Sequence, residues 1–460
     1  MSSSIVILGA GPAGLGAAFQ IARRKLGSVT VLEQRNNAGG NAGSFLLNGI
    51  HVDYGSHRLH PSCDPRILRD LSDLLGGALL DRPRHGRIRL KGKWIHFPLK
   101  PLDLALHLPP EFAFQALADA LAKPFRRQRE GPRSFASVLE AGLGPAICRE
   151  FYFPYAKKIW GVPPEQLSAV QAQRRVSGNS PARMLRKVLT RGAGRFYYPR
   201  EGYGQISEQL CQAARKHGAE ILFGCRVTRV ESSRVWFERA GRQENIEAGH
   251  LWSTLPINFL VKSFNPAPPG DVLEAANDLA FRAMILVYLT LDQRQFSEYD
   301  AHYFPEERLP ISRLSEPKNY SAAEEPRDRT VLCAELPCQV DSPHWKMTDD
   351  QLGQLVSDAL FDAGIPIDAR VSAVVTRRLA HAYPLYTAGY DENFTKLESW
   401  LKQFPRLLTL GRQGLFAHDN THHALYMAYS AVDCLDASGG FDRDRWVRYR
   451  KEFETHVVED

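Results

Sequence analysis

The sequence lacks several features that would place it in a simple class. None of its apolar runs reaches the length of about 18–20 residues that spans a bilayer. Its seven cysteines are scattered, odd in number and without C-x-x-C spacing, so neither a disulfide framework nor a zinc site is expected. The first strand-like run follows MSSS directly, which leaves no room for a signal peptide, and no internal repeat is visible. These absences predict a protein of the reducing cytoplasm.

Length and charge narrow the possible partners. A chain of 460 residues suits two or three interlocked domains, and 44% hydrophobic with 24% charged residues is ordinary for a globular protein. The net charge of +7 is unevenly placed, because Arg82–Lys100 holds seven Lys and Arg and 171–200 holds eight, both without an acid. No nucleic-acid motif accompanies this charge, so no nucleic-acid partner is expected.

Two interpretations of the positive charge stay open. The segment 101–127, PLDLALHLPPEFAFQALADALAKPFRR, combines an apolar helical pattern with basic residues and could make a peripheral contact with an anionic membrane surface. Otherwise the charge forms a solvated face or attracts an anionic small-molecule substrate. For the oligomeric state, the expectation is a monomer or a homodimer.

The segment IVILGAGPAG (5–14) places three glycines in G-x-G-x-x-G spacing after a strand-like run. The first glycine allows a tight turn into a helix, the second lets the backbone approach a pyrophosphate, and the third lets the helix pack on the strand. An Ala-rich helical stretch follows, and a second strand, Val29–Leu32, ends at Glu33, about 20 residues on, where a ribose hydroxyl needs an acceptor. The chain is therefore predicted to bind a dinucleotide.

A second glycine-rich stretch, QRNNAGGNAG (34–43), offers backbone N–H groups and a guanidinium to phosphates. With Glu33 it has E-x-R-x-x-x-G-G spacing, which resembles the second phosphate loop of a large family of FAD enzymes. That family includes amine oxidases, protoporphyrinogen oxidases, carotenoid desaturases and UDP-galactopyranose mutases. The resemblance implies FAD as the cofactor and an α/β fold. It would have a doubly wound Rossmann-like FAD-binding domain, an antiparallel β-sheet substrate domain and a helical insertion.

Segments with a strand pattern alternate with segments with a helical pattern, and they divide the chain into the same FAD-binding and substrate parts. The FAD-binding parts are expected at 1–80, 196–260 and 401–460. The substrate side is expected at 81–195, which includes the helical insertion, and at 261–400, which carries the second sheet.

Further segments match the family's elements in order. ILFGCRVTRV (221–230) resembles the strand whose backbone, here at Val227, holds the adenine. LLTLGRQGLFAHDNTHH (407–423) resembles the segment whose helix N-terminus faces the flavin, where it would stabilise negative charge. His418 and His422 have the i, i+4 spacing of a metal pair, but no third ligand is nearby, so no metal is expected. The residues implied to bind FAD are Gly9, Gly11, Pro12, Ala13, Gly14, Glu33, Gln34, Arg35, Gly39, Gly40, Asn41, Val227, Gly411, Arg412, Asn420 and Thr421.

Several sequence segments resemble elements of the UDP-galactopyranose mutase branch of this family. DYGSHRLHP (53–61) resembles its glycine–histidine loop, FYFPYAKKIWGVPPEQLSA (151–169) its tryptophan motif, and ISRLSEPKNY (311–320) its arginine-bearing strand. The resemblance implies the catalytic residues His57, His60, Trp160, Arg313 and Tyr383. It implies Arg174, Arg175 and Tyr155 for substrate binding.

The resemblance leaves two activities open, beside a cofactor-bound interaction protein without turnover. The leading hypothesis is an FAD-dependent oxidoreductase that moves a hydride between a polar, anionic or glycosyl small substrate and flavin N5. The alternative is a nucleotide-sugar isomerase similar to UDP-galactopyranose mutase, in which N5 of reduced FAD is the nucleophile. Two departures from the mutases favour the oxidoreductase. The strand Thr330–Leu336 has no tyrosine and would set Glu335 against a diphosphate, and 415–418 lacks the mutase arginine.

Overall fold

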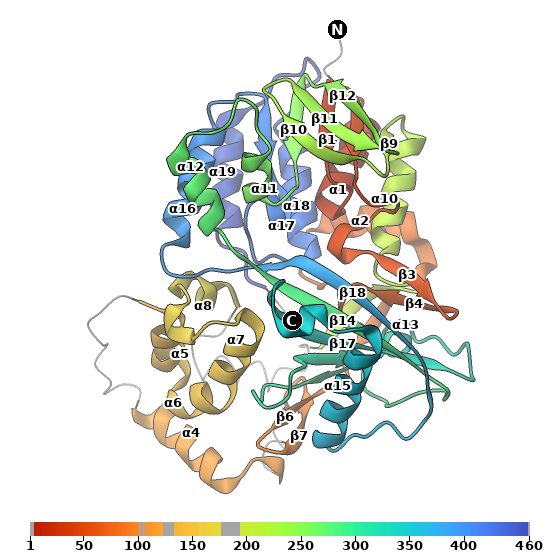
Figure 1. Ribbon diagram of the computed structural model, residues 1–460, viewed down its shortest axis with the longest axis vertical. Coiled ribbons are helices and arrows are strands. Elements are labelled where there is room, and N and C mark those ends of the chain that lie inside the picture. Colours follow the sequence, from red (N-terminus) through yellow and green to blue (C-terminus); the bar gives the residue numbers. More distant parts are fainter. Residues whose placement is uncertain (1–3, 101–102, 104–105, 123–132, 176–193, 459–460) are drawn as a thin grey trace.

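A parallel sheet of five strands forms the upper half of the molecule in Figure 1. The computed structural model describes residues 4–100, 103, 106–122, 133–175 and 194–458. Three distant segments of the chain supply the sheet, in the order β19-β13-β1-β2-β9. Its strands are β1 (Ser4–Leu8), β2 (Ser28–Leu32), β9 (Glu220–Leu222), β13 (His250–Ser253) and β19 (Leu407–Thr409).

Both faces of this sheet are buried, because successive residues of a strand point to opposite sides. Ile5 and Ile7 belong to one hydrophobic cluster, and Val6 and Leu8 belong to another. The first cluster is covered by α1 (Pro12–Arg23), α2 (Pro65–Leu75), α10 (Gln205–Lys216), α18 (Thr421–Asp433) and α19 (Arg443–Phe453). The second is covered by α11 (Ile257–Lys262), α12 (Gly270–Asp278), α16 (Tyr390–Leu401) and the ribbon β10 (Arg226–Val230), β11 (Arg234–Arg239), β12 (Arg242–Glu247).

A second sheet of seven strands, antiparallel except for the β15–β6 pair, lies below the first (Figure 1). Along its strand β14, Ile285, Val287 and Leu289 pack with α15, whereas Met284 and Leu286 face the opposite side and line a cavity. One strand thus separates a hydrophobic core from a candidate site. In sheet order the strands are β18 (Val371–Pro384), β14 (Phe281–Leu291), β17 (Thr330–Cys338), β16 (Arg313–Ser315), β15 (Ala301–Tyr303), β6 (Gly86–Leu90) and β7 (Lys93–Phe97), and α15 spans Asp349–Asp362.

Shorter elements complete the described part of the chain. The hairpin β3 (Ser44–Leu47) and β4 (Ile50–Asp53) packs on β14, and β5 (Leu79–Pro83) pairs with β8 (Arg195–Pro199). The helical insertion comprises α4 (Pro110–Ala122), α5 (Phe135–Leu143), α6 (Pro145–Ile147), the π-helical turn η4 (Cys148–Tyr152), α7 (Phe153–Trp160), η5 (Pro164–Gln166) and α8 (Ala169–Arg175). The others are η1 (Gly40–Ala42), η2 (Gly76–Ala78), α13 (Pro317–Ser321), α14 (Pro343–Lys346) and α17 (Gly411–Gly414).

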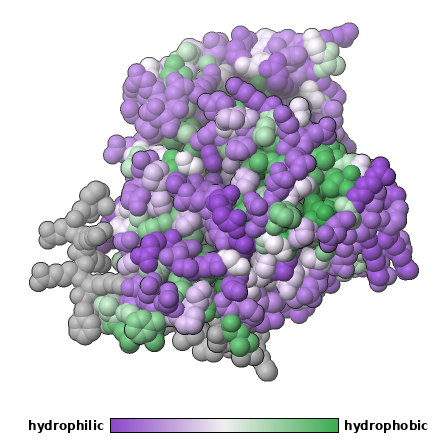
Figure 2. Space-filling view, turned by 60° about the horizontal axis from the view of Figure 1, so that its bottom comes forward, coloured by the Kyte–Doolittle hydropathy of each residue, from purple (hydrophilic) through white to green (hydrophobic). Residues whose placement is uncertain are grey.

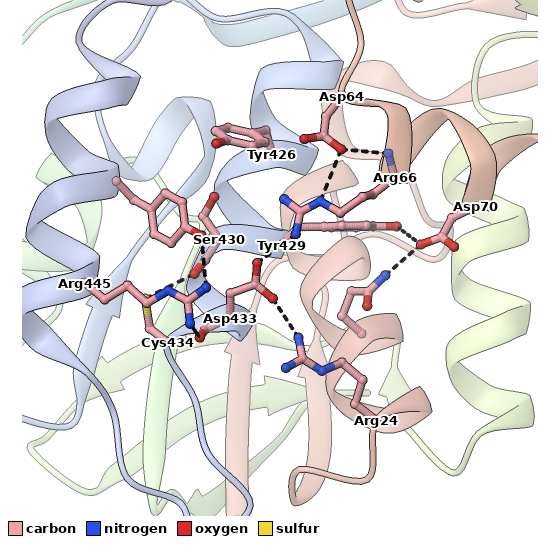
Figure 3. Close-up of polar contacts among 12 residues, drawn as sticks. Arg24, Asp64, Arg66, Asp70, Tyr426, Tyr429, Ser430, Asp433, Cys434 and Arg445 are labelled. Atoms are coloured by element: carbon pink, nitrogen blue, oxygen red, sulfur yellow. Dashed lines mark hydrogen bonds and ion pairs between the residues drawn. The ribbon is translucent and has the colours of Figure 1, made fainter.

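A polar network fixes α18 against α1 and α2 (Figure 3). Tyr429 of α18 donates a hydrogen bond to Asp70 at 2.8 Å. Arg24 and Arg66 each form an ion pair with Asp433 at 2.9 Å. The network sets the direction of α18, and with it the position of the helix N-terminus.

The architecture confirms the predicted α/β class, with a Rossmann-like parallel sheet, a largely antiparallel second sheet and a helical insertion. The proposed domain boundaries stay predictions. Within the described ranges, no helix has both the length and the apolar content to cross a membrane.

Candidate functional site

A cavity of about 480 Å³ lies where the two sheets meet. The loops after β1 and β2 line what we call its loop end, formed by Gly9 and residues 11–13, 33–35 and 40–42. The second sheet and the loop after β4 line what we call its strand end, formed by residues 54–58 of that loop and by Met284, Leu286, Arg313, Glu335 and 378–383 of the sheet. Residues 411–413 and 418–421 also line the cavity. The carboxyl ends of parallel strands are the usual ligand site of such a fold.

At the loop end, the first and third glycines of the motif are required by close packing. Gly9 has a φ of +101°, which favours glycine, and a Cβ there would clash with Thr254 Oγ1. A Cβ on Gly14 would overlap the carbonyl oxygen of Gly9. Helix α1 can therefore begin directly beside β1 only with glycine at both positions.

The second glycine of the motif differs, because nothing lies within 4 Å of the Cβ that it would carry. Gly11 is the N-cap of α1, and no side chain caps the helix there. A Cβ on Gly40, which has a φ of +55°, would lie 3.4 Å from Gly11 Cα. The two glycine loops thus leave a backbone cradle at a helix N-terminus, which fits the pyrophosphate of FAD.

Glu33 and Arg35 brace this cradle. The buried carboxylate of Glu33 accepts the N–H groups of Ala10 and Arg35, both at 2.8 Å. Its oxygens retain lone pairs that a ribose hydroxyl can use. The guanidinium of Arg35 donates to the carbonyl of Gly40 at 2.8 Å, within the second glycine loop, and the N–H of Gly39 donates to the carbonyl of Ala10 at 2.8 Å, which ties the second loop to the first.

A second helix N-terminus, that of α18, lines the cavity through Asn420 and Thr421. The N–H of Asn420 donates to His423 Nδ1 at 3.3 Å, as part of a capping box. Because a helix N-terminus stabilises negative charge, this end of α18 suits an electron-rich part of a ligand.

His57 lies at the strand end with its ring stacked on Tyr203, at a centroid distance of 5.3 Å. Its Nε2 lies 2.9 Å from the carbonyl oxygen of Asn41 and 3.0 Å from that of Tyr54. Two carbonyl acceptors require Nε2 to carry the proton, so Nδ1 is the basic nitrogen. Burial lowers the pKa of His57, which favours the neutral ring near pH 7.

Arg313 and Glu335 form a buried ion pair at the strand end. The register of β16 and β17 sets them opposite each other, and Nε and Nη2 of Arg313 each donate to the carboxylate at 2.9 Å. Burial disfavours the charged guanidinium, but the adjacent Glu335 carboxylate outweighs this and raises the pKa of Arg313 well above its usual range. Each charge of the pair therefore neutralises the other.

The same ion pair holds the loop that carries His57. The carboxylate of Glu335 accepts the N–H of Ser56 at 2.8 Å, and Nη2 of Arg313 donates to the carbonyl of Ser56 at 3.3 Å. Both backbone groups of Ser56 are thus bound, and the position of His57 follows from them.

An aromatic wall is built around His418. The ring of Tyr383 stacks on it at 6.2 Å, and the indole of Trp160 meets it edge-on at 6.2 Å. The guanidinium of Arg412 lies over the Tyr383 ring at 5.1 Å and donates to the carbonyl of Ala382 at 2.9 Å. Trp160 does not line the cavity itself and contacts it through His418.

Asp419, His423 and His456 have ligand atoms within 4.8 Å of one another, the arrangement of a possible metal site. However, the two imidazole rings are stacked at 4.2 Å and within 13° of parallel, so their in-plane lone pairs do not converge on one ion. His456 donates to Asp419 at 3.1 Å, and Arg174 lies 3.6 Å from the same carboxylate. The cluster is better described as a hydrogen-bonded support behind the cavity wall.

Of the five residues predicted to be catalytic, His57, Arg313 and Tyr383 line the cavity. Trp160 and His60 do not, and His60 is hydrogen-bonded to Ser62 at 2.7 Å. Their catalytic roles stay predictions.

Two of the three residues predicted for substrate binding lie outside the cavity lining. Tyr155 packs on Phe151, and Arg174 donates to the carbonyl of Phe453, both outside the cavity lining. The side chain of Arg175 lies outside the described part of the structure.

Thirteen of the sixteen residues predicted for FAD line the cavity. Gly14 is beneath the cradle, the N–H of Gly39 donates to the carbonyl of Ala10 at 2.8 Å, and Val227 is buried in a hydrophobic cluster.

Sequence reasoning missed three arginines of the lining, Arg58, Arg84 and Arg378. Arg58 is ion-paired with Asp300 at 3.3 Å and donates to the Tyr320 hydroxyl at 2.9 Å. Its position directly after His57 in the glycine–histidine phrase could have indicated it. No motif marks Arg84 or Arg378.

Comparison with known proteins gives one family and a set of related folds. A family model described as flavin containing amine oxidoreductase matches residues 12–426. A crystal structure of reduced UDP-galactopyranose mutase is 20% identical, covers 94% of this chain and 93% of its own, and has a TM-score of 0.81. Cyclohexylamine oxidase from Brevibacterium oxydans is 16% identical, with coverages of 95% and 99% and a TM-score of 0.64. At such identities the two structures establish the fold alone.

Proposed function

The chain belongs to the family of flavin-containing amine oxidoreductases, and on this premise we propose that it is an FAD-dependent oxidoreductase acting on a polar, anionic or glycosyl small substrate. The observation that carries the proposal is a single cavity with a backbone cradle for a dinucleotide at the loop end and guanidinium groups at the strand end. A cytoplasmic location stays a prediction.

FAD is the cofactor, and the loop end fits it. We assign the pyrophosphate to the backbone of Gly11 and Gly40, the ribose to Glu33, and the electron-rich edge of the flavin to Asn420 and Thr421. Bound FAD supplies the capacity to accept or donate a hydride.

The side chains of the strand end bind and orient the substrate in this proposal. His57 offers Nδ1 as a hydrogen-bond or proton acceptor, because two carbonyl groups hold the proton on Nε2. The Arg313–Glu335 pair acts as a positioning device for the loop of His57 rather than as a free charge. Tyr383 forms the opposite wall with His418 and Arg412.

The charge of the cavity selects the class of substrate. Its three carboxylates are already engaged, Glu33 by backbone N–H groups, Glu335 by Arg313, and Asp419 by His456. The surplus of positive charge favours an anionic or hydroxyl-rich molecule and disfavours an amine cation. The lining arginines are Arg35, Arg58, Arg84, Arg313, Arg378 and Arg412.

The alternative is a UDP-galactopyranose mutase-like isomerase. The resemblance in fold to that mutase and the arginines at the strand end support it. Against it, Glu335 neutralises Arg313, an arginine that the resemblance implies for the catalytic site. An arginine bound in this way has little remaining affinity for a second anion.

A spectral titration tests both activities on the purified holoprotein. We expect FAD absorbance, bleaching of the flavin by a hydroxylated or anionic substrate under anaerobic conditions, and recovery in air. The oxidised and dithionite-reduced forms are also titrated with UDP and UDP-sugars. Tighter nucleotide binding after reduction, with sugar isomerisation only in the reduced form, would replace the oxidoreductase by the isomerase. If no substrate bleaches the flavin and no nucleotide binds, both the oxidoreductase and the isomerase are rejected.

A further inference from the structure

Tyr320 carries a buried hydroxyl group whose hydrogen bonds can be traced one by one. Hydrophilic side chains cover most of the face shown in Figure 2, and such surface groups bond to water in ways that the fold does not determine. Tyr320 is only 2% exposed, so its hydroxyl must find its partners within the protein. The structure gives it two, Nη2 of Arg58 at 2.9 Å and Oγ of Ser56 at 2.5 Å.

The direction of both bonds follows from the groups that form them. A guanidinium can only donate, so an N–H of Arg58 points at the Tyr320 oxygen. The hydrogen of the Tyr320 hydroxyl then needs an acceptor, and among the residues that the structure describes only Ser56 Oγ lies within reach. If Ser56 donated instead, the phenolic hydrogen would be buried without an acceptor, which is costly. Tyr320 therefore donates to Ser56.

Arg58 is suited to begin this chain of hydrogen bonds because it is held in place. Its side chain is 8% exposed, pairs with Asp300 at 3.3 Å and donates to the Tyr303 hydroxyl at 3.1 Å. Its guanidinium also lies over the ring of Phe196 at 5.3 Å. Because Asp300 balances its charge, Arg58 acts through Tyr320 as a positioning residue rather than as a free cation.

The hydroxyl of Ser56 keeps its own hydrogen for a partner in the cavity. Ser56 lines the cavity, and its backbone N–H and carbonyl are already bound by Glu335 and Arg313. Within the described part of the chain, its hydroxyl bonds to Tyr320 alone. A hydroxyl that accepts one hydrogen bond becomes a stronger donor in the next, so the chain from Arg58 through Tyr320 prepares Ser56 to donate.

We propose that Ser56 binds the substrate, with its hydroxyl donating a hydrogen bond to a carboxylate or carbonyl oxygen of that molecule. The inference rests on the proposed function, because it concerns the substrate of the same cavity. An oxygen of this kind offers lone pairs, whereas a protonated amine offers only N–H donors and cannot accept the hydrogen of Ser56. The contact with Ser56 therefore selects an oxygen-bearing group over an ammonium group.

Calorimetric titration of the oxidised, FAD-loaded protein with three small aromatic probes tests the proposal. Benzoate and benzamide both carry an acceptor oxygen, and benzamide has no charge, whereas benzylamine is similar in size and is protonated at neutral pH. Ser56→Ala should weaken the binding of benzoate and benzamide by about fivefold or more, the loss of one hydrogen bond, and leave that of benzylamine unchanged.

The matched control is Ser62→Ala, because Ser62 is exposed, bonds to His60 and does not line the cavity. It should change none of the three affinities. Urea unfolding of the same variants tests the direction of the bond between Tyr320 and Ser56. Ser56→Ala should shift the unfolding equilibrium by about tenfold, because the buried hydrogen of Tyr320 loses its acceptor, and Ser62→Ala should not shift it.

Three outcomes of the titration would overturn the proposal: no binding of benzoate or benzamide by the wild type, equal binding of either probe by Ser56→Ala, or an equal loss of benzylamine affinity. An unchanged stability of Ser56→Ala would reverse the direction of the bond and remove Ser56 as a donor. A failure of the oxidoreductase activity gives a different result. If the two probes depend on Ser56 but no substrate bleaches the flavin, the binding role stands and the activity is rejected. If a substrate bleaches the flavin but neither probe depends on Ser56, the activity stands and the binding role is rejected.

Discussion

The two ends of the cavity are built from different parts of the polypeptide. The loop end consists mainly of backbone, with two glycine loops and the N-terminus of α1 around open space. The strand end consists of long side chains, such as Arg313, Glu335 and Tyr383, that reach the cavity from separate strands. A backbone cradle depends on the absence of side chains, whereas the strand end depends on which side chains meet. We therefore expect mutations at the two ends to have separable effects.

The largest effect is expected from the glycines of the loop end. Gly14→Ala should cost about 3 kcal/mol or more of unfolding free energy, because its Cβ would overlap the carbonyl oxygen of Gly9. Gly11→Ala should leave the stability of the FAD-free protein unchanged, because its Cβ meets no atom within 4 Å, yet weaken FAD binding by at least about tenfold, the equivalent of 1.4 kcal/mol. Thermal unfolding of both variants, with and without FAD, measures this difference.

For this pair, the wild type provides the control, since added FAD should raise its unfolding temperature and should raise that of Gly11→Ala far less. If Gly11→Ala loses stability without FAD as Gly14→Ala does, the open space at Gly11 is not a ligand cradle.

An effect of comparable size is expected at the strand end. Arg313→Met would leave Glu335 buried without its counter-ion, at a cost of about 3–5 kcal/mol. Arg313→Met/Glu335→Gln should recover most of that loss, because the glutamine is uncharged and its carbonyl can still accept the N–H of Ser56. Urea unfolding of the single and double variants measures the coupling.

FAD affinity separates the two ends in the same experiment. Since neither Arg313 nor Glu335 belongs to the loop end, the folded double variant should bind FAD within about twofold of the wild type. A parallel loss of FAD affinity and of stability would show that the ends are one energetic unit.

The loop end of the cavity could be predicted from the sequence more fully than the strand end, because one is built from backbone and the other from side chains on separate strands. The spacing of glycines in 5–14 and 34–43 encodes the cradle locally, so that residues such as Gly11, Glu33 and Arg35 could be named from the chain alone. The Arg313–Glu335 pair depends on the register of β16 against β17, which no local pattern specifies. From the sequence alone, Glu335 was expected to repel an anion, whereas the fold pairs it with a cation.

Two buried histidines test whether the two halves of the fold, the one around the parallel sheet and the one around the second sheet, lose stability together as the pH falls. Burial lowers the pKa of His302, in the second sheet, and of His422, in α18, to about 3 in each case. In the unfolded chain a histidine has a pKa near 6.5 and gains a proton first as the pH falls. Stability is therefore unaffected above about pH 6.5, and each histidine removes up to about 1.4 kcal/mol per pH unit between pH 6.5 and pH 3.

Urea unfolding at pH 7 and pH 5 measures this slope. We expect His302→Asn and His422→Asn each to flatten it, with His217→Asn as the control, because His217 is exposed on the surface. If unfolding is a single transition and both variants flatten its pH dependence, the parallel-sheet half and the second-sheet half unfold together. If there are two transitions, and each variant flattens the pH dependence of only one of them, the two halves of the fold are separate in stability, as the two ends of the cavity are in function. If neither variant changes the slope, other groups must account for the acid sensitivity.

The smallest effect concerns the boundary between the ends. Arg412 follows the last strand of the parallel sheet, yet its guanidinium lies over Tyr383 and binds the carbonyl of Ala382 at the strand end. Arg412→Lys keeps the charge but loses the planar donor geometry, and we expect it to weaken FAD binding by about two- to fivefold, roughly 1 kcal/mol or less. Fluorescence titration of the apoprotein with FAD measures this, and UDP titration of the holoprotein is the comparison. If the variant weakens UDP binding and leaves FAD affinity intact, Arg412 belongs to the strand end, and only the α1 side of the cavity is built from backbone for the cofactor.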